Sequence, residues 1–554
     1  MDAAAPAADH VDVLIVGAGL SGIAAGRYLR TQLPGKRFAI LEARQAIGGT
    51  WDLFRYPGVR SDSDLATFAY AFKPWTQEQA IASGADILRY IRATAAEHDL
   101  EREIRFGHRV VRADWSGDDA AWTVEAVREP AGRGAPETVR ITCGFLFCAS
   151  GYYRYDEGYA PEFPGADRFA GTLVHPQDWP EDLEVEGRRI VVIGSGATAV
   201  TLVPALAERA AHVTMLQRSP SYVLSIPSRD PIANRLRRLL GDRRAHALVR
   251  RKNIWQQTQV YRLSRRYPRL VRRVLRALQR RALPPGYDVD THFNPAYDPW
   301  DQRLCMVPDG DLFRAIRAGR ASVVTDRIET FTRTGVRLES GAELEADVIV
   351  TATGLNLLAF GGMELAVGGT PVALPETLAY KGLMLGDVPN FAFAIGYTNA
   401  SWTLKVDLVC GWMCRLLAHM DAHGYDACVA PRDDPDMPTR PLLDFQAGYV
   451  LRALDRFPRQ GDGQPWRLPM SYAEDVAVLR DGPIDDGTLR FSRRGGGSGG
   501  QAADRSTMRA PSSSSSASAR SPSPGLTSTA RTADVSTVTE NPSRSASRAV
   551  FRTQ

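Results

Sequence analysis

"VDVLIVGAGLSGIAAGRYLR", residues 11–30, places a buried strand, a glycine-rich turn and a helix in direct succession. The apolar run Val11–Val16 has the length of a strand, and Gly17, Gly19 and Gly22 follow it in the spacing G-x-G-x-x-G. The first glycine permits a tight bend, the second lets backbone amides approach a pyrophosphate, and the third lets the helix pack on the strand. The positive end of the helix dipole then faces the phosphates. This stretch therefore predicts a Rossmann-like dinucleotide-binding domain.

An acidic residue and the segment after it indicate which dinucleotide binds. Glu42 lies twenty residues after Gly22, at the end of the apolar strand "FAILEAR" (residues 38–44). A carboxylate at this place accepts hydrogen bonds from ribose hydroxyls and repels a 2′-phosphate, so the turn favours FAD or NAD over NADP. The segment "GGTWDLFRYPGVRSD" (residues 48–62) then favours flavin, because its glycines let the chain pass close under an extended cofactor and its aromatic residues can wall a flat ring.

A second strand, glycine turn and helix begin at "RRIVVIGSGATAVTLVPALAERA" (residues 188–210). The next strand ends in "MLQRS" (residues 215–219), so Arg218 and Ser219 stand where Glu42 stands in the first unit. A guanidinium can bind a 2′-phosphate through two hydrogen bonds and a hydroxyl adds a donor, which predicts a preference for NADPH. The residues of this turn expected at the cofactor are Gly194, Ser195, Gly196, Ala197, Thr198, Ala199 and Val200.

The bulk composition is that of a globular protein and indicates neither a nucleic-acid partner nor a metal site. The 554 residues carry a formal net charge of +5, with 44% hydrophobic and 24% charged residues. The six cysteines are sparse, so we expect neither a metal site nor a redox pair among them, and this sparse use suits a reducing cytoplasm. No basic region precedes the first apolar run, and no stretch reaches the roughly 18 apolar residues of a membrane span. We therefore expect a cytoplasmic protein.

Composition and the two glycine turns predict an α/β fold with two Rossmann-like dinucleotide-binding domains, for FAD and NADP, a helical insertion and a disordered C-terminal tail. In chain order we expect the first part of the FAD-binding domain, a linker with the start of the NADP-binding domain, a basic helical insertion, the remainder of the NADP-binding domain, the second part of the FAD-binding domain with substrate-pocket elements, and the tail. The expected bounds of these six segments are 1–150, 151–224, 225–300, 301–350, 351–494 and 495–554.

The basic insertion has two interpretations. Between Arg229 and Arg281 roughly eighteen Arg and Lys residues accompany two Asp, with Leu, Val and Trp at helical intervals. One interpretation is a solvated helical cover over the active-site face. The other is a surface for an acidic partner or a membrane, so a peripheral membrane contact through residues 229–281 stays open.

A chain that binds both FAD and NADPH can pass a hydride from nicotinamide to flavin, and its electrons then need an acceptor. A disulfide acceptor would require a closely spaced cysteine pair beside the flavin, and we expect no such pair there. Oxygen, a quinone or another protein remain as acceptors.

A further string of residues connects the two glycine turns. "FAGTLVHPQDWP" (residues 169–180) matches F-x-G-x-x-x-H-x-x-x-W-P, the fingerprint of the class B flavoprotein monooxygenases of the Baeyer–Villiger type. The chain resembles this family from about Val11 to Arg490, and "YDPWDQRLCMVPDGDLF" (residues 297–313) is similar to its ketone and ethionamide-activating members. The resemblance implies that this segment links the two nucleotide domains and couples NADPH binding to their movement. Its fingerprint residues are Phe169, Gly171, His175, Trp179 and Pro180.

The resemblance also assigns residues to the site. It implies that Arg303 is the fixed cation of catalysis, that Asp62 orients this arginine near the flavin, and that Trp402 lines the substrate pocket. Gln302 stands where many relatives have a lysine for the NADP 2′-phosphate, which leaves more of the selectivity to Arg218. Further positions implied for FAD are Ser21, Gly49, Thr50, Trp51, Asp52, Leu53 and Val110, and those implied for NADP are Arg60 and Ser61.

The activity implied by the resemblance is an FAD-containing, NADPH-dependent monooxygenase. Such an enzyme forms a flavin C4a-peroxide with O2 and inserts one oxygen atom into an apolar ketone, giving an ester or lactone, or oxygenates a sulfide or thioamide. Two other functions stay open at this point. They are an N- or S-hydroxylase on the same fold, and a flavoprotein that passes electrons from NADPH to a quinone or protein. The sequence specifies neither the physiological substrate nor the oligomeric state.

Overall fold

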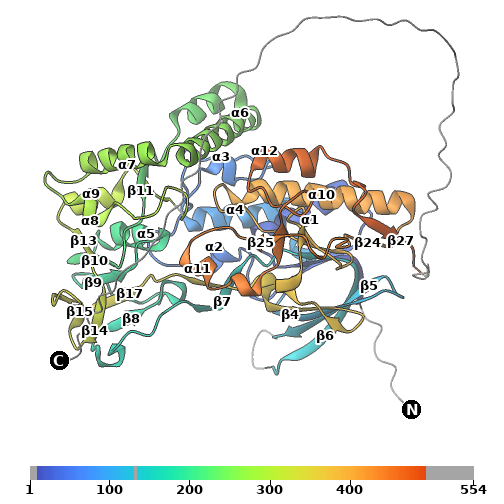
Figure 1. Cartoon of the computed structure of the whole chain (residues 1–554), viewed down its shortest axis with the longest axis horizontal. Coiled ribbons are helices and arrows are strands. Elements are labelled where there is room, and N and C mark those ends of the chain that lie inside the picture. The colour runs from blue at the N-terminus through green and yellow to red at the C-terminus, as the bar shows by residue number, and fades with distance from the viewer. Residues whose placement is uncertain (1–8, 130–133, 303, 495–554) are drawn as a thin grey trace, which may run out of the picture. The chain divides into compact units, whose positions relative to one another are not determined.

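We analysed a computed structural model of the chain, which describes residues 9–129, 134–302 and 304–494 (Figure 1). The described residues group into one compact unit. The tail predicted at residues 495–554 and the catalytic residue predicted at Arg303 lie outside the described residues.

The first glycine turn lies in a large mixed sheet. Strand β1 (Asp9–Val16) pairs in parallel with β2 (Phe38–Glu42) and with β6 (Glu137–Cys148), and helix α1 (Leu20–Gln32) joins β1 to β2. Antiparallel strands extend the sheet on the far side of β6. The remaining strands of this sheet are β3 (Ile104–Phe106), β4 (His108–Ser116), β5 (Ala121–Arg128), β19 (Glu364–Val367), β20 (Thr370–Pro371), β21 (Ala379–Tyr380), β22 (Met384–Leu385) and β23 (Phe391–Phe393).

Both faces of this sheet are covered, which explains the continuous apolar run of β1. Val13 and Ile15 pack on one face, under α1, α4 (Gly84–Glu97) and α10 (Trp402–His423), while Leu14 and Val16 pack on the other. Figure 1 shows these three helices lying together over the sheet. The predicted first unit is therefore confirmed as a strand, a turn and a helix.

The second glycine turn lies in a smaller, wholly parallel sheet. Its strand order is β13-β10-β9-β17-β8, and helix α5 (Ala197–Leu206) joins β9 to β10. Helix α9 (Asp311–Arg317) packs beside α5. The strands are β8 (Thr172–Val174), β9 (Arg189–Ile193), β10 (His212–Gln217), β13 (Ala321–Thr325) and β17 (Val348–Thr351). The second predicted unit is thus also confirmed.

Two long helices occupy the basic stretch, where the sequence predicts helical periodicity. Helix α6 spans Pro231–Arg266 and α7 spans Pro268–Ala282, and α6 is interrupted at Gly241, whose φ of 74° is not helical. Asp230 caps the first turn of α6 by accepting hydrogen bonds from two backbone amides, and Pro231 begins the helix. Helix α6 packs on the short helix α3 (Leu65–Phe68).

Shorter elements complete the described chain. The helices are α2 (Thr50–Leu53), α8 (Val289–His292), α11 (Gly448–Leu451) and α12 (Tyr472–Asp475). The small sheets are formed by β7 (Tyr153–Gly158) with β18 (Leu355–Leu357), β11 (Val223–Ile226) with β12 (Cys305–Pro308), β14 (Ile328–Thr332) with β15 (Gly335–Leu338) and β16 (Glu343–Glu345), β24 (Ala427–Val429) with β27 (Arg490–Ser492), and β25 (Thr439–Pro441) with β26 (Arg459–Gly461).

Candidate active site

One large cavity connects the two glycine turns. Its volume is about 1740 Å³, well above the roughly 300–1,000 Å³ of a site for one small molecule. Its wall includes both turns and the segment from Gly48 to Ser63. A cavity of this size and position can hold two nucleotide cofactors with a substrate between them.

The first turn forms a cradle that fits a pyrophosphate. A Cβ on Gly22 would lie 1.8 Å from the carbonyl oxygen of Gly17, so only glycine allows α1 to approach the strand this closely. Helix α1 begins after Gly19, which provides no side-chain cap, so the first amides of α1 are available to a phosphate.

Glu42 is built into the floor of the same cradle. Its carboxylate accepts hydrogen bonds from the backbone amides of Ala18, at 2.7 Å, and Arg44, at 2.9 Å. The residue is buried, and this burial raises the pKa of its carboxyl group. Glu42 lines the cavity together with Ser21, Thr50 and Val110, so these four predicted FAD positions are brought together.

The second turn repeats this arrangement at the other end of the cavity. Gly194 has a φ of 139°, and a Cβ there would lie 2.3 Å from the carbonyl oxygen of Ala352. Helix α5 begins after Gly196, which again provides no side-chain cap and has open space at its Cα. Ala199 and Val200 are buried in the core and do not line the cavity. The predicted residues that do line it are Gly194, Ser195, Gly196, Ala197, Thr198, Arg218, Ser219 and Gln302.

The segment after the first cradle supplies charged groups between the two turns. Ser61 and Asp62 line the cavity, and the Oγ of Ser63 donates a hydrogen bond of 3.3 Å to the Asp62 carboxylate. Arg60 also lines the cavity, and its guanidinium binds both carboxylate oxygens of Asp311, at the start of α9. An ion pair thus joins the two nucleotide-binding halves at this wall.

Three predicted FAD residues stand apart from the cavity wall. Asp52 is buried, and its carboxylate forms ion pairs with Arg44 at 2.8 Å and Arg92 at 3.0 Å. Leu53 and Gly22 likewise do not line the cavity. Asp52 holds α2 against its neighbours and so shapes the turn at Gly49 and Thr50, which do face the cavity.

The fingerprint residues lie behind the cavity. The His175 ring lies 3.3 Å from the carbonyl oxygen of Gly354 and accepts a hydrogen bond from the Gln177 amide, and burial lowers its pKa. A Cβ on Gly158 would lie 2.0 Å from this ring, so Gly158 makes room for it. Phe169 packs edge-on against Phe331. None of Phe169, Gly171, His175 and Trp179 lines the cavity, so their role in the connection stays a prediction.

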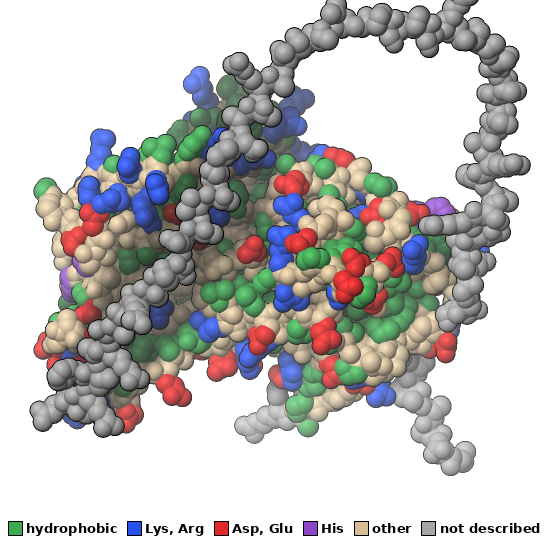
Figure 2. All heavy atoms as spheres, viewed as in Figure 1, with side chains coloured by type: hydrophobic (Ala, Val, Ile, Leu, Met, Phe, Trp, Pro, Cys, Tyr) green, Lys and Arg blue, Asp and Glu red, His purple; other side chains and the backbone are tan. Residues whose placement is uncertain are grey.

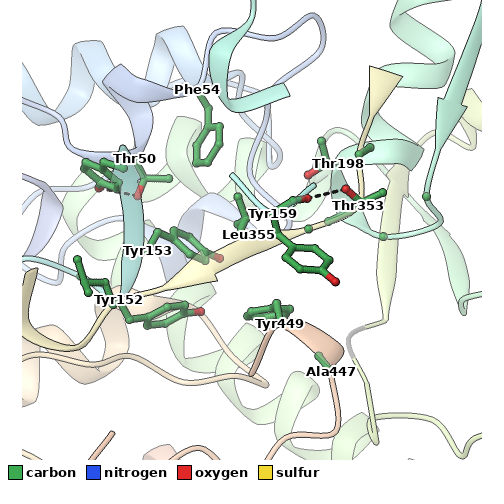
Figure 3. Close-up of a pocket in the computed structure, with 18 of the residues that line it drawn as sticks. Thr50, Phe54, Tyr152, Tyr153, Tyr159, Thr198, Thr353, Leu355, Ala447 and Tyr449 are labelled. Carbon is green, nitrogen blue, oxygen red and sulfur yellow. Dashed lines mark hydrogen bonds between the residues drawn. The ribbon is translucent and has the colours of Figure 1, made fainter. Parts of the chain in front are cut away.

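An aromatic chamber forms the part of the cavity that the sequence does not reveal. Figure 3 shows Tyr152, Tyr153, Tyr159 and Tyr449 around one open space, with Phe54 above them. The Arg452 guanidinium lies 3.4 Å from the centroid of the Tyr159 ring. Trp402 lines the cavity and donates a hydrogen bond of 2.9 Å to Ser21. Tyr449 and Arg452 carry no sequence signal, because they come from the short helix α11 and the residue after it, far along the chain.

Within the described ranges, with residues 1–8, 130–133, 303 and 495–554 left aside, no group of His, Cys, Asp and Glu is arranged to hold a metal ion. All six cysteines are buried and form no disulfide. In the same ranges, each helix is too short or too polar to cross a membrane.

Comparison with known proteins identifies relatives along most of the chain. A family described as flavin-binding monooxygenase-like matches residues 80–368, and an NAD(P)-binding Rossmann-like domain matches residues 15–78. The FAD-containing monooxygenase EthA of Mycobacterium tuberculosis is 54% identical over 487 residues, covering 88% of this chain and 98% of its own length.

Two solved structures share the fold at lower identity. A steroid monooxygenase bound to NADP is 22% identical with a TM-score of 0.68, and it covers 87% of this chain and 100% of its own. A cyclohexanone monooxygenase with bound ε-caprolactone is 20% identical with a TM-score of 0.66, over 87% of this chain and 100% of its own. The predicted α/β fold class with two Rossmann-like domains is thereby confirmed.

Proposed function

The chain belongs to the flavin-binding monooxygenase-like family of FAD-containing monooxygenases, and from this premise we propose that it performs Baeyer–Villiger oxidation. In this reaction one oxygen atom of O2 enters an apolar ketone to give an ester or lactone. We include sulfides and thioamides among its substrates. The observation that carries the proposal is the single cavity that joins both glycine turns to an aromatic chamber, so that two cofactors and an apolar substrate can meet.

The residues at the two ends fit FAD and NADPH. Glu42 and the uncapped start of α1 suit the ribose and pyrophosphate of FAD, while Arg218 and Ser219 at the second turn suit a 2′-phosphate. Bound FAD supplies the centre at which a hydride from NADPH is accepted and O2 is activated. Tyr152, Tyr153 and Trp402 wall the space between the turns and exclude water from the substrate.

We assign to Arg303 and Asp62 the stabilisation of the negative charge that develops on the substrate. A guanidinium stays protonated at every working pH, so it can donate hydrogen bonds to the oxyanion that develops on the substrate carbonyl oxygen. Gln302 and Leu304, the chain neighbours of Arg303, line the cavity, as does Asp62. These positions support the proposed roles. The division of the chain at residues 150, 224, 300, 350 and 494 likewise remains part of our proposal.

The direct test is product analysis with purified yellow protein, NADPH, a cyclic ketone and isotope-labelled O2. We expect one labelled oxygen atom in a lactone product for each NADPH consumed. No lactone from any ketone, together with labelled hydroxylamine or sulfoxide when an amine or a sulfide is supplied instead, would favour the heteroatom hydroxylase on the same fold. Hydrogen peroxide as the sole oxygen product, with electrons taken up faster by added quinone, would contradict a monooxygenase.

Removal of the Arg218 side chain tests the NADPH assignment. We expect Arg218→Ala to raise the KM for NADPH by about 10- to 100-fold, because a hydrogen-bonded charge contributes about 1.5–3 kcal/mol. The KM for NADH and the turnover at saturating NADPH should change little, since the 2′-phosphate is remote from hydride transfer. Initial rates with both nucleotides measure this. Arg209→Ala, an exposed arginine outside the cavity wall, is the matched control. An equal rise in the KM for NADH would show that Arg218 does not bind the 2′-phosphate.

A second proposal concerns where the protein acts: in the cytoplasm, with peripheral contact to an anionic membrane through α6 and α7. These helices carry seventeen Arg and Lys residues and one Asp. Figure 2 shows blue and green side chains gathered where Figure 1 places α7. Among the described residues, eleven of the thirteen exposed large apolar side chains lie between Ile232 and Leu278. An apolar and basic helical surface of this kind suits an anionic bilayer.

Vesicle sedimentation tests this surface. We expect the protein to sediment with phosphatidylglycerol vesicles at low salt and to be released from them at high salt. It should not sediment with phosphatidylcholine vesicles. Leu270→Ser combined with Val274→Ser should weaken the binding, because both side chains are half-exposed on α7. Leu173→Ser, at an exposed leucine elsewhere, is the control. Equal sedimentation with both lipids, or none with either, would contradict the proposal.

A further inference from the structure

A stripe of polar residues runs along one face of α6. His246, Arg250, Asn253 and Gln257 are spaced by four, three and four residues, which places them on one side of the helix. His246 and Arg250 are buried, and burial lowers the pKa of His246 to about 4, so the histidine is neutral at pH 7. The stripe contacts α3 and the segment after it through hydrogen bonds where a helix contact would usually be apolar.

Arg250 binds the end of α3. Its Nη1 donates to the carbonyl oxygens of Ala66, Thr67 and Ala69, at 3.3, 3.1 and 2.5 Å. Its Nη2 donates to the buried carboxylate of Asp407 at 2.9 Å. The guanidinium therefore satisfies the last carbonyl groups of α3, where a helix dipole favours positive charge.

Asn253 and Gln257 bind the beginning of the same helix. Asp64 caps α3, and its Oδ1 accepts hydrogen bonds from the amides of Ala66 and Thr67. The Nδ2 of Asn253 donates to Oδ1 of Asp64 at 2.7 Å, and the Nε2 of Gln257 donates to Oδ2 at 2.5 Å. One face of α6 thus holds α3 at both of its ends.

Helix α3 in turn positions two parts of the cavity wall. It follows Asp62 and Ser63, which line the cavity, without a break in the chain. The hydroxyl of Thr67 lies 2.7 Å from that of Ser401, the residue before Trp402. Trp402 lines the cavity at the start of α10 and binds Ser21. The residues that bear on substrate are therefore fixed through α3 on both sides.

We propose that the polar face of α6, formed by Arg250, Asn253 and Gln257, is a positioning element that holds Asp62 and Trp402 in place and so couples NADPH oxidation to oxygen insertion. This inference rests on the proposed monooxygenase function. None of the three residues lines the cavity, and they act through α3. A small shift of α3 would leave the two cofactor cradles intact and open the substrate chamber to water, which favours release of hydrogen peroxide over product.

A pair of matched substitutions tests the inference. Gln257→Glu places a second carboxylate against Asp64, whereas Gln256→Glu makes the same change one residue away on the exposed face of α6. We expect Gln257→Glu to raise hydrogen peroxide released per NADPH by about threefold or more, within the range of coupling energies between contacting groups. The rate of anaerobic flavin bleaching by NADPH should stay within about twofold, because the cradles are untouched. Gln256→Glu should match the wild type in both measurements.

A compensating change separates positioning from general damage. Asp64→Asn in the Gln257→Glu background restores one carboxylate facing one amide, and asparagine still caps a helix. We expect the double variant to recover the wild-type ratio of product to peroxide. If Gln257→Glu does not fold, Asn253→Ala, which removes one donor to Asp64, takes its place with the same expected loss of coupling.

The outcomes of this experiment separate failure of the proposed monooxygenase function from failure of the positioning role. A wild-type protein that makes no oxygenated product with any ketone or sulfide contradicts the proposed function itself. A wild-type protein that makes product, together with variants that keep the wild-type ratio of product to peroxide, overturns the positioning role. Variants that only lose thermal stability or FAD content at an unchanged ratio overturn it as well.

Discussion

Arg303→Ala is expected to lose oxygen insertion while reduction by NADPH continues. Removing one preorganised donor to a developing oxyanion costs about 10²- to 10³-fold in kcat, and this arginine is the group that we assign to that place. NADPH oxidation should then yield hydrogen peroxide. Anaerobic bleaching of the flavin by NADPH should remain near the wild-type rate, since both cofactor cradles are built by other residues.

Arg303→Lys separates charge from geometry in this experiment. Lysine keeps the positive charge but lacks the planar fork of donors, so we expect a partial recovery of product formation. Product analysis and peroxide release are measured side by side with an apolar ketone. If Arg303→Ala retained the wild-type yield of product, the fixed cation of the reaction would have to be sought among the arginines of the cavity wall, which include Arg109, Arg327 and Arg452.

Gly22→Ala is expected to give a protein without bound FAD. The added Cβ would lie 1.8 Å from the backbone carbonyl oxygen of Gly17. Because the clashing atom belongs to the backbone and not to a flexible side chain, it cannot move aside easily. Helix α1 would have to move away from β1, which takes the first amides of the helix away from the pyrophosphate. Overpacking of this kind costs about 1–3 kcal/mol, so we expect FAD affinity to fall by about 100-fold.

Gly35→Ala is the matched control for this change. Gly35 lies in the loop after α1, and a Cβ there would meet nothing within 4 Å. FAD content is read from the flavin absorbance of the purified protein and from titration of the apoprotein. A yellow Gly22→Ala protein with wild-type affinity would contradict the close packing of α1 on β1.

The two strand–turn–helix units could be predicted from the sequence because their information is local. Gly17, Gly19 and Gly22 are required by backbone stereochemistry within a few residues, and Glu42 follows at the end of the next strand. The continuous apolar run of β1 already implies burial on both faces, as observed. Location in the cavity could be anticipated for Arg218 from its place after the second turn, and for Trp402 from the family resemblance.

Ion pairs and hydrogen bonds between residues far apart in the sequence could not be predicted in this way. Arg60 was expected at NADP, and the structure shows its guanidinium on Asp311, 251 residues away in sequence. Asp52 was expected at FAD, and it holds arginines outside the cavity wall. The polar stripe on α6 has a readable period, but its partner, the helix capped by Asp64, lies some 190 residues earlier, and no local pattern connects them.

By itself the sequence determined that this protein has two dinucleotide-binding units, because glycine turns act through the stereochemistry of neighbouring residues. The tertiary structure alone decided how the aromatic chamber is formed and held. Tyr152, Tyr449 and Arg452 meet there from distant segments, and Arg250 reaches Asp407 across the interior. Such contacts depend on the positions of helices and loops in the folded protein. Hydrogen bonds and ring contacts act over a few ångströms in space, whatever the separation of the residues along the chain.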